Sequence, residues 1–126
     1  MAGSETAAVA PEILTRSLVN VAVESWRMGK VLERMLTKLD VGERKRYGSR
    51  YRWFVKKVEE SLEEAGLRIV DIEGHPFNVG MAATALNVEE FEVDDTLIVD
   101  RMLEPIIMGK DGLLRAGTVV LRKAEQ

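Results

Sequence analysis

The apolar residues between Leu14 and Leu39 recur in alternating steps of four and three positions, and this spacing constrains the fold more than any other feature. The members of the row are Leu14, Leu18, Val21, Met28, Leu32, Met35 and Leu39, with Ser25 as the interruption. This spacing places them all on one face of an α-helix. Pro11 suits a first helical position and Glu12 a first turn. We therefore predict a helix over 11–38.

A second amphipathic helix is predicted directly after the first. Residues 40–43, Asp-Val-Gly-Glu, have the form of a capping box. The apolar face that follows consists of Tyr47, Tyr51, Phe54, Val55, Val58, Leu62 and Ala65. Gly66 stands where a left-handed helix end is expected. The two helices are predicted to form a hairpin, whose heptad-like face needs a partner, either a β module or a second copy of the chain.

Beyond Gly66 the apolar pattern changes from a helical period to strict alternation. Residues 67–72 alternate like a half-buried strand, and the Gly74 and Pro76 that follow end it. The segment 76–87 is compatible with either a helical turn or an irregular loop.

Two further strands are predicted over 96–102 and 118–121. The Asp-Gly pair at 111–112 is typical of a hairpin turn, here between 105–109 and 113–115, and Pro105 places its strand at an edge or a break. We therefore predict an α+β fold. Its parts are a disordered tail (1–10), a helical dimerisation segment (11–66) and a small all-β domain (67–126).

Composition excludes several classes of protein. Of the 126 residues, 46% are hydrophobic, which excludes wholesale disorder, and no apolar run is long enough to span a membrane. The absence of cysteine excludes disulfides, thiolate zinc sites and thiol catalysis. The first ten residues lack the features of a secretory signal, so we expect a cytoplasmic protein.

Enzyme signatures are missing from the sequence. It has neither a phosphate-binding glycine loop nor a nucleophile elbow. His75, the single histidine, lies in a Gly-His-Pro turn. As a general base it would need an orienting carboxylate such as Glu73, and an exposed turn residue is the favoured interpretation. We expect a protein that is not an enzyme and that carries no cofactor and no metal.

Charge is distributed unevenly along the chain. Residues 1–66 hold 12 basic and 10 acidic side chains, whereas residues 67–126 hold 6 and 11. The basic cluster comprises Arg44, Lys45, Arg46, Arg50, Arg52, Lys56 and Lys57. Interleaved with Tyr47, Tyr51 and Trp53, it is compatible with a nucleic-acid face. An acidic protein partner or simple solvation is the favoured interpretation, because both tyrosines fall on the apolar face. The acidic run at 89–95 indicates a solvated loop or a negatively charged docking surface.

Three segments follow one another along the chain: Glu-Glu-Ala-Gly-Leu-Arg-Ile-Val at 63–70, Pro-Phe-Asn at 76–78, and Gly-Leu-Leu-Arg-Ala-Gly-Thr-Val-Val-Leu at 112–121. In this order they resemble GrpE, the family of nucleotide exchange factors of DnaK-type chaperones. The resemblance covers about residues 12–123 and is carried by order and spacing rather than by one motif. Where the family shows a His-Glu-Ala or His-Gln-Ala run, this sequence has Met-Ala-Ala-Thr-Ala at 81–85. The chain resembles a divergent, short form that lacks the family's long N-terminal helix.

The resemblance implies a co-chaperone that binds the nucleotide-binding domain of a DnaK-type chaperone and promotes ADP release. By analogy with the family, the chaperone-binding residues are Met81, Leu103, Ile106, Ile107, Arg115 and Leu121. The helices would form a homodimeric four-helix bundle through Leu14, Leu18, Val21, Met28, Leu32 and Met35. Two alternatives remain: an adaptor on the same fold that binds another protein, and a nucleic-acid-binding module that uses the basic helix at 44–57.

Overall fold

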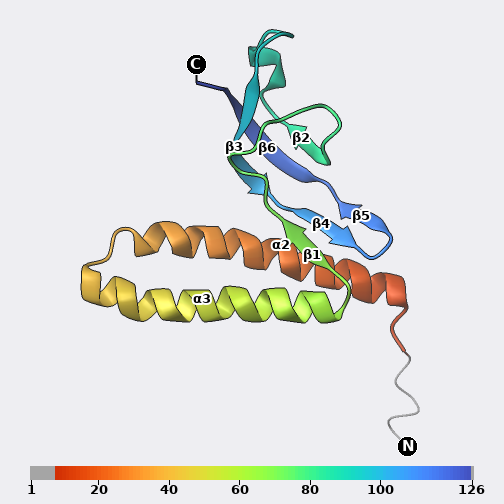
Figure 1. The fold of residues 1–126 in the computed structure, drawn as a ribbon. Helices are drawn as coiled ribbons and strands as arrows, with labels where there is room; N and C mark the ends of the chain where they lie inside the picture. Colours follow the sequence, from red (N-terminus) through yellow and green to blue (C-terminus); the bar gives the residue numbers. More distant parts are fainter. Residues whose placement is uncertain (1–7, 126) are drawn as a thin grey trace, which may run out of the picture.

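A computed structural model describes residues 8–125 and has an α+β fold, as predicted. Helix α2 (Pro11–Leu36) and helix α3 (Val41–Glu64) pack against each other as a hairpin. In Figure 1 the helices run side by side, and the β module rises from the hairpin while the connection between the helices projects beyond it. Most of the predicted disordered tail, 1–7, lies outside the described residues.

Local interactions fix both ends of α3. The Asp40 carboxylate accepts a hydrogen bond from the backbone N–H of Glu43 at 2.9 Å, which confirms the predicted cap. The Arg44 guanidinium donates to the carbonyl group of Leu36, the last residue of α2, at 3.2 Å and to that of Leu39 in the connection at 3.0 Å. At the other end Gly66 has a φ of 79°, a left-handed conformation that favours glycine. The sequence of the connection therefore determines where each helix stops.

The β module contains two three-stranded sheets. Its strands are β1 (Arg68–Val70), β2 (Ala83–Ala85), β3 (Leu97–Glu104), β4 (Ile106–Gly109), β5 (Gly112–Arg115) and β6 (Gly117–Lys123), with a short 3₁₀ helix η1 (Val88–Glu90) before β3. The first sheet is antiparallel in the order β1-β4-β5. The second has the order β2-β6-β3, in which β2 pairs with β6 in parallel and β3 pairs with β6 antiparallel.

The predicted strands and the predicted hairpin are present, and Pro105 stands at the break between β3 and β4, where the chain passes from one sheet to the other. The short strand β2 differs from expectation, because the segment 76–87 was predicted to hold a helical turn or a loop. Its small residues pair with β6, which is more than thirty positions away. No local pattern indicates such a pairing.

Two apolar clusters form the core. The first joins the helices to the first sheet and contains Val19, Ala22, Val23, Leu62, Leu67 and Ile107. The second lies within the β module and contains Ile72, Val99, Met102, Ile106, Val119 and Leu121. The neighbours Ile106 and Ile107 belong to different clusters, because both faces of β4 are covered. Burial on both faces fixes β4 between the hairpin and the second sheet.

Candidate functional site at the junction of helices and β module

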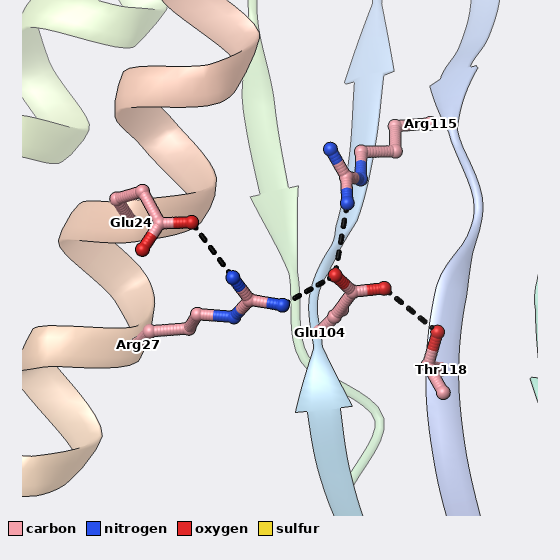
Figure 2. A network of polar contacts seen from close by, with 5 residues as sticks. All are labelled: Glu24, Arg27, Glu104, Arg115 and Thr118. Atoms are coloured by element: carbon pink, nitrogen blue, oxygen red, sulfur yellow. Dashed lines mark hydrogen bonds and ion pairs between the residues drawn. The ribbon is translucent and has the colours of Figure 1, made fainter.

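A network centred on Glu104, at the end of β3, joins α2 to the β module (Figure 2). Arg27 of α2 and Arg115 of β5 both donate to one carboxylate oxygen, and Thr118 of β6 donates to the other at 2.9 Å. Arg27 also pairs with Glu24 on its own helix. The Thr118 hydrogen bond, with the charges of the two arginines, lowers the pKa of Glu104. An ionised carboxylate therefore ties three strands to one helix.

A second ionic cluster lies one turn further along α2. The Lys30 ammonium is 3.0 Å from Asp71 and 3.4 Å from Glu73, both on the segment after β1. Glu73 also accepts a hydrogen bond from the backbone N–H of Met102 at 2.8 Å. Burial opposes the charge of Lys30, but the hydrogen bond to Asp71 and the negative charge of both carboxylates outweigh it, so the pKa of Lys30 is raised. Together the two ionic clusters add to the apolar contacts of the first core cluster in joining the β module to the hairpin.

An open cleft of about 340 Å³ runs between α2 and β3, beside these clusters. Its lining residues are Trp26, Arg27, Lys30, Val31, Arg34, Glu73, Arg101, Met102 and Leu103. Four of them are cationic and one is anionic. Arg34 and Arg101 form no ion pair with any residue between 8 and 125. The cleft therefore combines apolar walls with two uncompensated positive charges.

The predicted chaperone-binding residues fall into two groups. Ile106, Ile107 and Leu121 are core residues, 5%, 0% and 4% exposed. Their side chains pack inside the core and are not accessible to a partner, so the prediction that they contact a chaperone is wrong for these three residues. Alternation along a strand predicts that one of two neighbouring isoleucines faces solvent, but β4 is covered on both faces.

The remaining three predicted contact residues are partly accessible, but they do not lie together. Leu103 lines the cleft, whereas Arg115 belongs to the Glu104 network. Met81 packs on the second core cluster, and its sulfur accepts a hydrogen bond from the backbone N–H of Asn78. Leu103 is thus the predicted residue best placed for a partner at the junction.

The predicted dimer residues lie on a largely exposed row of α2. Leu14, Val21, Met28 and Met35 are exposed by 56%, 58%, 54% and 55%. Leu18 and Leu32, which alternate with them, are partly buried, and Leu18 packs against the first core cluster. The fold of one chain leaves most of this apolar row in contact with solvent. Its burial by a second copy stays a prediction.

The other candidates contribute little to the junction. His75 is exposed in the turn after β1, as favoured from the sequence. In the acidic run, the Asp95 carboxylate accepts from the backbone N–H of Glu92 and lies 3.7 Å from Lys123. Within residues 8–125 no group of three or more histidine, cysteine, aspartate or glutamate side chains is arranged to hold a metal ion.

Sequence reasoning missed the charged residues that link the two parts, above all Glu104 and Lys30. The one available signal was a carboxylate beside a proline at the end of an apolar strand, which alone indicates no partner. No family model, no curated protein and no solved structure matches this chain. Neither described helix has the length and apolar composition needed to cross a bilayer. Function is therefore inferred from the residues of the chain and their arrangement.

Proposed function

We propose that this protein is a nucleotide exchange factor for a DnaK-type chaperone. The support is the GrpE-like order of segments at 63–70, 76–78 and 112–121, together with a two-part structure of helical hairpin and β module. One observation carries the proposal furthest: the Glu104 and Lys30 clusters link the β module to the hairpin beside an open cleft. A two-part body joined by these contacts suits a protein that selects one conformation of its partner.

The proposed mechanism involves no bond chemistry. The protein binds the open form of the nucleotide-binding domain more tightly than the closed form. By thermodynamic linkage, this preference weakens the binding of ADP to the chaperone. Each tenfold loss of ADP affinity requires about 1.4 kcal/mol of preferential binding to the open form. Leu103 and Val31 supply apolar contact in the cleft, and Arg34 and Arg101 attract an acidic region of the chaperone.

The test is release of a fluorescent ADP analogue from a DnaK-type chaperone of the same organism. We expect saturable acceleration by the unaltered protein, and at least a tenfold higher half-maximal concentration for Leu103→Asp. Val93→Asp, at a fully exposed position in the acidic loop, is the control and leaves the rate unchanged. Binding without acceleration would favour an adaptor on this fold. Absence of both binding and acceleration would refute the proposal.

We also propose that the protein is a homodimer through the exposed row of α2. Val21→Asp changes a side chain that is 58% exposed, so the single chain still folds while its apolar row carries a charge. We expect sedimentation at the mass of one chain for this variant and at twice that mass for the unaltered protein. Val41→Asp, at a 78% exposed position on α3, serves as the control. Equal sedimentation of Val21→Asp and unaltered protein would exclude this interface.

A further inference from the structure

A basic stripe with a tryptophan at its centre runs along α3. Arg46, Arg50, Trp53 and Lys57 follow one another in steps of four, three and four, which places them on one face of the helix. Trp53 is 64% exposed, whereas Leu62, nine positions on, is 3% exposed. Nine residues are about two and a half turns, so the stripe lies opposite the face that packs in the core. We propose that this basic stripe binds single-stranded nucleic acid.

The stripe lies in the most cationic part of the chain. Between residues 34 and 57 there are nine basic and two acidic side chains. Among these cations Lys57 pairs with Glu60 at 3.6 Å, whereas Lys45, Arg50 and Arg52 form no ion pair within the described residues. Like charges held close together repel, and a polyanion relieves this repulsion while releasing its own counterions. The charge of the stripe is therefore complementary to a phosphate backbone.

The exposed aromatic ring favours a nucleic acid over other polyanions. The Lys57 ammonium lies 5.8 Å from the centre of the Trp53 ring, and the Arg46 guanidinium lies 4.9 Å from that of Tyr47. A flat indole flanked by cations accepts an unpaired base by stacking, which is worth about 1–3 kcal/mol per base and tolerates any sequence. An acidic peptide would neutralise the charges but leave the indole without a planar partner.

The geometry also argues against a membrane and against duplex DNA. From Arg46 to Lys57 the stripe spans about 17 Å, at about 1.5 Å per helical residue, and Trp53 is its single large apolar side chain. A helix that lies in a bilayer surface needs a whole apolar face. In a duplex the bases are already stacked on one another, whereas a single strand offers free bases to Trp53.

The inference is independent of the proposed exchange activity, because the stripe lies on α3 and the cleft between α2 and β3. The probe is a fluorescein-labelled thymidine 20-mer, measured by polarisation at several salt concentrations. We expect binding with a slope of log affinity against log salt of about −2, as about three phosphate contacts to a single strand require. Tryptophan fluorescence should be quenched on binding.

Variants then test the stripe itself. Arg50→Glu should weaken binding at least tenfold, and Trp53→Ala about 5- to 150-fold with loss of the quenching. Arg16→Glu makes the same charge change at an exposed position of α2 and should leave binding unchanged. All three positions are exposed, so circular dichroism should show intact folding. Trp53→Ala should retain full acceleration of ADP release, which separates failure of this inference from failure of the exchange function.

Three outcomes would overturn the inference. The first is no binding of the 20-mer at low salt, and the second is equal loss of affinity in Arg50→Glu and Arg16→Glu. The third is preference for another partner. Polyglutamate bound as tightly as the 20-mer would indicate a docking site for an acidic protein, and phosphatidylserine vesicles bound when the 20-mer is not would indicate an anionic membrane.

Discussion

Replacing Glu104 with glutamine tests whether the network in Figure 2 joins the two parts of the molecule. The amide oxygen can still accept from Thr118, but the attraction to Arg27 and Arg115 is lost. The Glu104 side chain is 23% exposed and the arginines are 43% and 36% exposed, so each ion pair is partly screened. Exposed pairs contribute about 0.2–1 kcal/mol each. For the two pairs together we expect a loss of about 1–2 kcal/mol in the free energy of unfolding. Each pair counts near the upper end of the range for exposed pairs, because both cations are left facing a neutral amide.

The assay is urea unfolding followed by circular dichroism, at pH 7 and at pH 3. Because the folded protein lowers the pKa of Glu104, its stabilisation is present above the unfolded pKa and is lost as pH falls through the folded value. The difference in the free energy of unfolding between the unaltered protein and Glu104→Gln should therefore be larger at pH 7 than at pH 3. Asp100→Asn, which breaks an ion pair to Arg122 whose members are 53% and 46% exposed, should cost less. Equal cost of the two variants, or a difference independent of pH, would refute the reasoning.

Three other changes test the fold. Ile107→Ala should lower the free energy of unfolding in urea by about 2–5 kcal/mol, because the side chain is fully buried. The control Leu113→Ala, at 49% exposure, should lower it by less than about 0.5 kcal/mol, and similar values for the two variants would contradict the core assignment. Gly66→Ala should lower the melting temperature by about 4–8 °C, since left-handed backbone costs a non-glycine residue about 1–2 kcal/mol. Asp40→Ala should lower the melting temperature more at pH 7 than at pH 3. The backbone hydrogen bond from Glu43 lowers the pKa of Asp40, so its stabilisation is present above the unfolded pKa and is lost as pH falls through the folded value; an equal effect at both pH values would exclude the cap.

The helices were predictable because their signals are local. The four-three spacing from Leu14 to Leu39 and the cap at Asp40 depend on residues within one or two turns of each other, and the structure has both helices within two residues of the expected ends. The Asp-Gly turn likewise specified its hairpin. Strand β2 was missed because three small residues carry no period and find their pairing partner far along the chain.

The junction was largely hidden from the sequence. No local sequence pattern distinguishes a glutamate that faces solvent from one that, like Glu104, pairs with two arginines from distant segments. Alternation also failed at Ile106 and Ile107, because it assumes one covered face and β4 has two. The accessible members of the predicted contact set, such as Leu103, were named from a family resemblance, and only the structure separates them from core residues.

The order of the second sheet has a consequence for how the molecule is made. Strand β6 lies between β2 and β3, yet it comes after both in the sequence. During synthesis β2 and β3 therefore have no partner in their sheet until residue 123 has emerged, whereas the helical hairpin is complete by residue 66. A nascent chain paused between these points would display the cationic helix pair beside an unpaired, apolar β segment. Until the central strand arrives, the acidic side chains of the β segment itself must keep its apolar residues in solution.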